Sequence, residues 1–134
     1  MKVEILHEDS DILVCIKPVG MPVQGDKSRD VDLLTYLKHY IFEKEEMDEE
    51  PYLAMIHRLD RPVGGVMVFA KNQDAAAKLS DQVQDGTMVK FYQAILTGEL
   101  PQESGTLEDY LLKDGKTNTC LLYTSPSPRD ATLS

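Results

Sequence analysis

The stretch that most constrains this chain of 134 residues is a charged turn followed by a short apolar run. Residues 57–65, His-Arg-Leu-Asp-Arg-Pro-Val-Gly-Gly, lead directly into Val-Met-Val-Phe-Ala at 66–70. The two glycines permit a tight turn or a close backbone approach, because glycine lacks the Cβ that forbids such conformations. An apolar, partly β-branched run this short is typical of a buried strand. We therefore expect Asp60 on a loop at the edge of a sheet.

Asp60 lies between Arg58 and Arg61, whose charges are permanent. A cation within a few Å of a carboxylate favours its ionised form, and an ionised, positioned carboxylate can act as a nucleophile or a base. The same residue types also fit a structural ion pair that pins the turn. The charges alone favour this structural ion pair over catalysis.

The net charge of −9 argues against a nucleic-acid partner, because phosphate binding requires Lys and Arg. Residues 43–50 supply much of it, since six acidic residues and one lysine give this segment a net charge of −5. Such a run is usually a solvated loop. RNA binding would then need a local basic patch. The candidates for that patch are Lys17, Arg58, Arg61, Lys71 and Lys90.

The length and the apolar runs fit one globular domain of a cytoplasmic protein. No apolar run is long enough for a signal peptide or a membrane span, so we expect no membrane partner. Cys15 and Cys120 form neither a metal pattern nor a redox pair, and we expect both to be reduced.

The first half of the chain predicts a hairpin and a helix. Residues 3–6 and 11–16 fit two strands around a polar turn. A helical stripe covers residues 32–44, with Ser28 or Asp30 as the expected N-cap.

The second half predicts further strands and a second helix. In order they are a strand at 51–56, a strand at 66–70, a helix from the cap Asn72 to near Gly86, a strand at 88–97 and a strand at 106–112. Strands outnumber helices and several follow one another. We therefore expect an α+β fold with a mixed, mostly antiparallel sheet and flanking helices.

Three motifs follow one another along the chain: Lys-Pro-Val-Gly at 17–20, His-Arg-Leu-Asp at 57–60, and Lys-Phe-Tyr-Gln-Ala at 90–94. Their order and spacing resemble the RluA family of RNA pseudouridine synthases, and three matches are far more specific than one. The resemblance covers residues 1–119 and implies a partial pseudouridine synthase catalytic domain. The family's downstream Gly-Arg-Thr-His-Gln-Ile-Arg-like segment is not found. The resemblance therefore does not predict activity for the chain by itself.

The resemblance implies a reaction in which uridine of ribosomal or transfer RNA becomes pseudouridine without a metal or an organic cofactor. Asp60 matches the family's essential aspartate, which attacks either the ribose or the uracil ring. Arg58 matches the arginine that helps to hold the flipped-out nucleotide. Tyr92 matches the tyrosine that packs on the target base and assists proton removal. A salt bridge for Arg58 and a half-buried aromatic for Tyr92 are the structural alternatives.

RNA is the partner that the resemblance implies, and we expect the complete protein to be a monomer. Lys17, Arg61 and Lys90 are the further expected RNA contacts. His57 belongs to the motif, but we expect its ring nitrogens to bind backbone or neighbouring carboxylates and not to take part in the chemistry.

From Cys120 onward the sequence becomes rich in serine and proline and the resemblance ends. Residues 120–134 resemble a peptide translated from adapter DNA, and we expect a tail that is non-native or disordered. The alternative function is a catalytically inactive RNA-binding fragment or interaction module. The acidic charge favours this alternative, whereas the presence of Asp60 and Tyr92 favours the enzyme.

Overall fold

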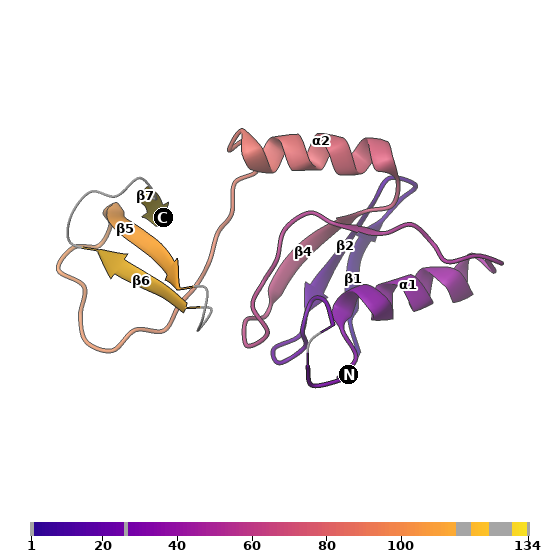
Figure 1. Cartoon of the computed structure of the whole chain (residues 1–134), viewed down its shortest axis with the longest axis horizontal. Coiled ribbons are helices and arrows are strands. Elements are labelled where there is room, and N and C mark those ends of the chain that lie inside the picture. Colours follow the sequence, from indigo (N-terminus) through magenta and orange to yellow (C-terminus); the bar gives the residue numbers. More distant parts are fainter. Residues whose placement is uncertain (1, 26, 115–118, 124–129, 134) are drawn as a thin grey trace. The chain divides into compact units, whose positions relative to one another are not determined.

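The computed structural model describes residues 2–25, 27–114, 119–123 and 130–133. The chain forms two compact units, Met1–Phe91 and Tyr92–Ser134, and each is described by itself. The first contains a 4-stranded antiparallel sheet and helices, and the second a 3-stranded antiparallel sheet (Figure 1). This architecture confirms the expected α+β class. No helix in the described part of the chain is long and apolar enough to cross a membrane.

The sheet of the first unit has the strand order β1-β2-β4-β3. Its strands are β1 (Glu4–Glu8), β2 (Ile12–Lys17), β3 (Ala54–Met55) and β4 (Gly65–Ala70). The predicted hairpin is confirmed, and Asp9 closes it by accepting hydrogen bonds from the backbone N–H groups of Asp11 and Ile12, both at 2.8 Å. The strand predicted at 51–56 is shorter than expected, because only β3 pairs with β4.

The pairing of β2 with β4 places the two motif loops side by side. This pair runs from Ile12 opposite Ala70 to Lys17 opposite Gly65. The loop that follows Lys17 and the loop that precedes Gly65 therefore leave the sheet at the same end. The predicted strand at 66–70 is confirmed as β4, which lies between β2 and β3 and begins at this end of the sheet.

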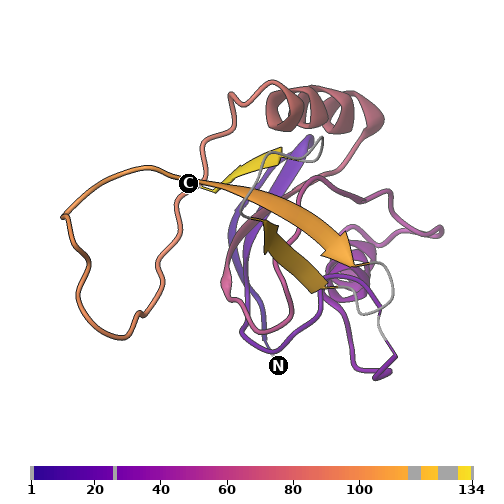
Figure 2. The ribbon, with the colours of Figure 1, turned by 60° about the vertical axis from the view of Figure 1, so that its left-hand side comes forward.

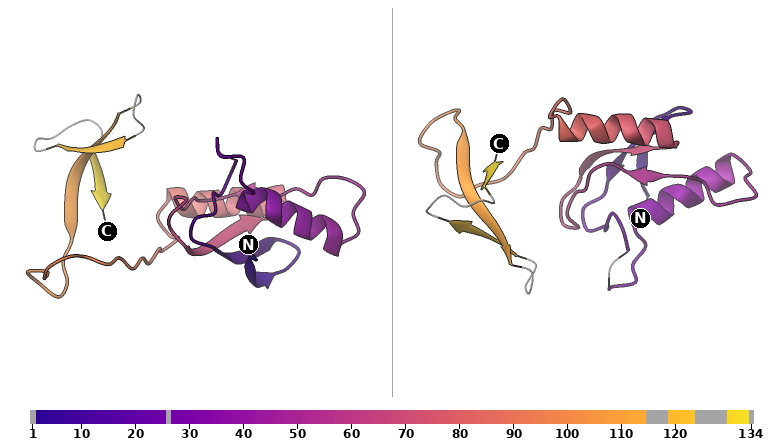
Figure 3. Two further views of the ribbon diagram at one scale, coloured as in Figure 1. Left: turned by 90° about the horizontal axis from the view of Figure 1, so that it is seen from below. Right: turned by 45° about the horizontal axis from the view of Figure 1, so that its top comes forward.

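Helix α1 (Leu33–Lys44) covers one face of the sheet (Figure 3). Its buried stripe packs against alternate residues of β2 and β4; the core positions are Leu33, Leu37, Ile41, Leu13, Cys15, Met67 and Phe69. Its N-cap is Asp32, which accepts the Thr35 N–H at 2.7 Å, so the expected caps Ser28 and Asp30 were wrong. Asp32 immediately precedes the first turn in an extended conformation, whereas Asp30 pairs with Arg61.

Helix α2 (Gln73–Gln84) packs beside β3 and β4. Asn72 caps it as predicted, with its side chain accepting the Ala75 N–H at 2.8 Å. Gly86 follows the helix end with φ at 79°, a left-handed conformation that glycine adopts without strain.

The second unit contains β5 (Leu107–Asp114), β6 (Thr119–Tyr123) and β7 (Asp130–Leu133), in the order β6-β5-β7. Strand β5 confirms the strand expected at 106–112. Strands β6 and β7 fall largely in the segment expected as a tail, of which 124–129 and 134 lie outside the described residues. The boundary at residue 119 and the non-native origin of 120–134 stay predictions. Cys15 is buried and free, and the side chain of Cys120 lies outside the described part.

The strand predicted at 88–97 is wrong. This segment pairs with no strand among the described residues, and Figure 2 shows it as an open trace between α2 and β5. Phe91 and Tyr92 are 91% and 61% exposed, so they do not divide between a buried and an open face. Sequence alternation indicates which side chains could be buried, but a strand also needs a neighbouring backbone for its hydrogen bonds.

Candidate active site

Lys17 joins the two motif loops from inside the protein. Its side chain is fully buried, and its ammonium donates to the backbone oxygens of Pro18 at 3.0 Å, Met21 at 2.7 Å and Arg61 at 3.0 Å. Burial lowers the pKa of Lys17, the charge of Arg61 lowers it further, and the charge of Asp60 raises it. An ammonium with three hydrogens on three carbonyls has none left for a phosphate. The structure thus places Lys17 as an internal brace and not as the RNA contact we expected.

Gly20 and Arg61 form the second connection between the loops. The Gly20 N–H donates to the Arg61 oxygen at 2.8 Å, and Arg61 Nε donates to the Gly20 oxygen at 2.9 Å. Gly20 has φ at 88° in a turn closed by the Met21 N–H on the Pro18 oxygen at 3.4 Å. A residue with a Cβ would be strained there, so the turn requires glycine.

The Arg61 guanidinium is engaged within the protein. It donates to Ser28 Oγ at 2.9 Å and forms an ion pair with Asp30. The ion pair that the charges suggested therefore exists, but its carboxylate comes from Asp30 and not from Asp60. These contacts attach the residue after Asp60 to the loop that precedes α1. We call them the Arg61 clamp, and they engage the guanidinium that would otherwise be available to a phosphate.

Gly64 allows the two loops to approach closely. A Cβ built there would lie 2.9 Å from Val19 Cγ2 and 3.3 Å from the Lys17 oxygen. The first glycine of the pair is thus explained by packing, as the sequence predicted from its lack of a Cβ.

Asp60 is exposed, and its carboxylate forms no hydrogen bond or ion pair with the residues that the structure describes. Its backbone oxygen accepts the Val63 N–H at 2.9 Å, which closes a turn over residues 60–63. The next residue, Arg61, is held by Gly20 and Lys17 as described above. The site therefore presents a solvent-exposed carboxylate on a turn whose backbone is held by the hydrogen bonds of Gly20 and Lys17 to the Arg61 oxygen.

His57 binds β4 instead of taking a place beside Asp60. Its Nε2 accepts the backbone N–H of Val68 at 3.2 Å. Burial lowers the pKa of His57, and the nearby charge of Lys90 lowers it further, so the ring is neutral near pH 7. The expectation that this histidine holds backbone is confirmed.

The basic patch expected from the sequence is only partly available on the surface. Lys71 is nearly buried and pairs with Glu8 at 2.8 Å and with Glu45 at 3.1 Å. Lys17 and Arg61 are engaged as described. Arg58 and Lys90 are exposed and form no ion pair with any described residue. These two cations are the part of the patch that a polyanion can reach.

Glu8 is the centre of a separate ionic cluster. Its carboxylate accepts from Tyr40 Oη at 3.0 Å, Lys44 Nζ at 2.7 Å and Lys71 Nζ at 2.8 Å. Burial raises the pKa of Glu8, but these three donors lower it by more, to about 2. The cluster ties β1 to α1 and to the end of β4, so it holds the scaffold and leaves the two loops free to form the site.

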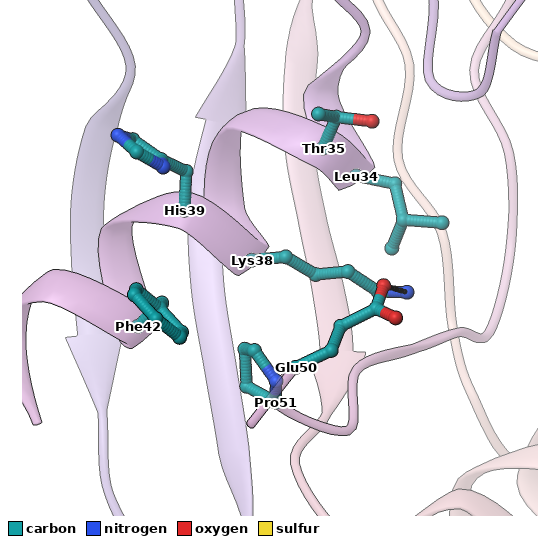
Figure 4. A pocket seen from close by; sticks show the side chains of 7 residues that line it. All are labelled: Leu34, Thr35, Lys38, His39, Phe42, Glu50 and Pro51. Carbon is teal, nitrogen blue, oxygen red and sulfur yellow. Dashed lines mark hydrogen bonds and ion pairs between the residues drawn. The ribbon is translucent and has the colours of Figure 1, made fainter. Parts of the chain in front are cut away.

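Cavities that described residues line lie beside the Arg61 clamp and beside α1. One, of about 500 Å³, adjoins the clamp and is lined by Gly20, Met21, Pro22, Asp30, Val31, Tyr36 and Arg61. The other, of about 350 Å³, lies on the outer side of α1 (Figure 4). There Lys38 Nζ meets Glu50 Oε1 at 2.9 Å, beside the apolar side chains of Phe42 and Pro51. The first cavity borders the motif loops, whereas the second contains no motif residue.

Tyr92 is the first residue of the second unit, and its packing on the target base stays a prediction. No group of three His, Cys, Asp or Glu side chains in the described part of the chain is placed to hold a metal ion. Sequence reasoning missed the partners of Arg61, namely Gly20, Ser28 and Asp30. The glycine in Lys-Pro-Val-Gly was the available signal for the first, whereas nothing local marks a contact across 31 residues for Asp30.

Comparison with known proteins identifies the family. The sequence model of the family described as RNA pseudouridylate synthase matches residues 11–132. The ribosomal large subunit pseudouridine synthase C of Salmonella typhi is 33% identical over 110 residues, which are 82% of this chain and 33% of that protein. An uncharacterized RNA pseudouridine synthase of Helicobacter pylori is 30% identical over 115 residues, 85% of this chain and 35% of that protein.

A solved structure shows the same fold. The human RNA pseudouridylate synthase domain containing 4 matches with a TM-score of 0.75 and 24% identity, over 96% of this chain and 50% of that one. The chain spans about a third of the length of the curated relatives it matches. The match over nearly the whole chain and the loops built from its motifs lead to one assignment: the chain belongs to the RluA family of RNA pseudouridine synthases.

Proposed function

We propose that this chain carries the aspartate loop of an RNA pseudouridine synthase, which isomerises uridine to pseudouridine in ribosomal or transfer RNA in the cytoplasm. The observation that carries the proposal is the exposed Asp60 carboxylate, which has no partner among the described residues and lies on a braced turn. Relatives named as ribosomal large subunit pseudouridine synthases favour ribosomal RNA.

Asp60 is the proposed nucleophile. A carboxylate already engaged in a strong ion pair would have to break that pair before attacking, and here Asp30 takes the Arg61 guanidinium instead. Lys17 and Gly20 fix the backbone of Arg61, so Asp60 needs little reorganisation to meet a substrate.

On the ribose route, Asp60 bonds to C1′ while the C1′–N1 bond breaks and the uracil anion stays bound; after the base has turned, C5 bonds to C1′ and the carboxylate leaves. On the uracil route, Asp60 adds to C6, the C1′–N1 bond breaks within the adduct, and C5 bonds to C1′ before the carboxylate is expelled from C6. On both routes C5 loses its proton and N1 gains one, so the carboxylate is restored.

Arg58 and Lys90 are the proposed RNA contacts of the first unit, and Tyr92 is proposed to pack on the target base. Both cations are exposed and free of carboxylate partners among the described residues, so they can bind phosphate without breaking a protein ion pair. The base inside a helix is unreachable, so the nucleotide must be extruded toward Asp60. Arg58, two residues before Asp60, is proposed to hold that extruded nucleotide.

Tritium release from RNA labelled at uracil C5 tests this proposal, because C5 loses its hydrogen when it becomes the glycosidic carbon. The assay compares the 134-residue chain with a chimera in which residues 1–119 are continued by the remaining sequence of a relative. Asp60→Asn is made in the chimera, with Asp48→Asn as the matched control, because Asp48 is also an exposed aspartate but lies in the acidic segment.

We expect release by the chimera and by its Asp48→Asn variant, and none by Asp60→Asn. Release that persists in Asp60→Asn would refute the role of Asp60. If the chimera releases no tritium from either ribosomal or transfer RNA, the enzyme proposal is wrong, and binding without release would indicate the inactive RNA-binding module.

A further inference from the structure

The side chain of His57 takes the place of a backbone hydrogen bond between β3 and β4, at the point where the chain leaves β3 toward Asp60. Strand β3 pairs with β4 only at Ala54 opposite Ala70 and Met55 opposite Phe69. In the same register the next pair would be Ile56 and Val68, but the Val68 N–H donates to His57 Nε2 at 3.2 Å. A side chain thus takes the bond that a continued strand would take, three residues before Asp60.

This bond determines which form of the imidazole is present. Nε2 can accept only if it carries no hydrogen, so the neutral ring must hold its proton on Nδ1. That Nδ1 is buried and has no hydrogen-bond partner among the described residues. A second proton on Nε2 would turn the acceptor into a donor facing the Val68 N–H. The bond between His57 and β4 therefore exists only while the ring is neutral.

We propose that His57 is a positioning residue for Asp60, and that it acts only as the neutral ring protonated on Nδ1; the role in catalysis rests on the proposed function. With the bond formed, the chain between β3 and the Asp60 turn is attached to the centre of β4. Asp60 is then fixed on both sides, by His57 before it and by the Arg61 clamp after it. Protonation of the ring releases the first attachment and leaves the second.

The charges around the ring are consistent with this form. Lys90 is the described charged side chain whose field lowers the pKa of His57, after the larger effect of burial. No carboxylate of the described residues forms an ion pair with the ring, in contrast to His7 with Asp9 and His39 with Glu43. The surroundings thus disfavour the imidazolium and keep the acceptor in place at neutral pH.

Nitrogen-15 NMR of the 134-residue chain tests the inference without any RNA. The imidazole nitrogens of His57 report the tautomer, and the amide signals of Val68, of residues 59–61 and of Val63 report the attachment. We expect a protonated Nδ1 and a bare Nε2 at pH 7. On acidification, the Val68 and loop amides should shift with the same midpoint as the ring, at a lower pH than for an ordinary histidine because burial lowers the pKa of His57.

Two variants and a control complete the test. His57→Gln offers an amide oxygen that accepts at any of these pH values, so the loop amides should keep their neutral positions and lose the titration. His57→Leu offers no acceptor, and exchange of the Val68 amide should become about tenfold faster, as expected for one lost hydrogen bond. His39→Gln, at an exposed histidine of α1, should change none of these signals.

A ring protonated on Nε2, or loop amides that do not follow the titration of His57, would overturn the inference. If His57→Leu does not fold, the titration in wild type and its loss in His57→Gln decide the question. In the chimera, the rate of pseudouridine formation should fall on acidification with this midpoint in wild type but not in His57→Gln. A chimera inactive at every pH would count against the proposed function, while the NMR result would still decide the attachment.

Discussion

Replacing Lys17 by methionine tests whether the two motif loops are held from inside. Methionine keeps most of the buried apolar stem, so the change removes the ammonium without opening a large cavity. Three carbonyls lose a charged donor. The Arg61 oxygen keeps the Gly20 N–H, and the Pro18 oxygen keeps a long bond from the Met21 N–H at 3.4 Å. No other donor to the Met21 oxygen is found among the described residues.

The loss in the free energy of unfolding caused by Lys17→Met follows from what these three carbonyls retain. A hydrogen bond to a charged group contributes about 1.5 to 3 kcal/mol, and a buried acceptor left without a donor costs about 1 to 3 kcal/mol. Removing the ammonium also removes the penalty for burying it, which is visible as the lowered pKa of Lys17. With one carbonyl left without a donor and two weakened, we expect the free energy of unfolding to fall by about 2 to 3 kcal/mol.

Urea denaturation followed by circular dichroism measures this loss. Lys78→Met is the matched control, because Lys78 is an exposed lysine of α2 with no contact to either loop, and it should change stability by less than about 0.5 kcal/mol. A Lys17→Met variant as stable as Lys78→Met would refute the role of Lys17 in holding the two motif loops together. So would a loss of stability that leaves the amide signals of residues 19–21 and 61 unchanged.

Three further predictions follow from the ionic and backbone features. Because the pKa of Glu8 is depressed to about 2, its contribution of about 3 kcal/mol to the free energy of unfolding is present above pH 4.5 and is lost as the pH falls toward 2. Glu8→Gln should therefore lower the free energy of unfolding at pH 7 by this amount and reduce the dependence of stability on pH below 4.5. Glu4→Gln should have neither effect. Gly20→Ala should cost about 1 kcal/mol in thermal denaturation through its backbone conformation alone, since a Cβ there meets nothing within 4 Å. Asp60→Asn should lower the pKa of Lys17 in an NMR titration, because the Asp60 charge raises it; an unchanged pKa would contradict the proximity of the two side chains.

The sequence was informative where local patterns decide structure. The hairpin over β1 and β2, the strand β4 and the Asn72 cap depend on neighbouring residues and were predicted from them. The segment 88–97 shows the limit, since its alternation is typical of a strand but pairing depends on a distant backbone. The family motifs likewise identified Asp60 and its loop, because they are short and contiguous.

The roles of the cations could not be read from the sequence. Lys17, Arg61 and Lys71 all looked available to RNA, but each is engaged by groups that are far away in the chain or that are backbone oxygens. The choice of Asp30 over Asp60 as the partner of Arg61 depends on how the loop before α1 folds back, which no local pattern specifies. A buried lysine bound by carbonyls has the same sequence signature as an exposed one.

The proposed function requires that Asp60 performs chemistry on RNA and does not merely help to bind it. The most direct measurement compares, in the chimera, the dissociation constant for substrate RNA with the single-turnover rate of pseudouridine formation, for wild type and Asp60→Asn. We expect Asp60→Asn to bind the RNA within about twofold of wild type, a difference of about 0.4 kcal/mol, and to form no pseudouridine. Turnover that survives in Asp60→Asn, or that falls only as far as RNA binding falls, would contradict it.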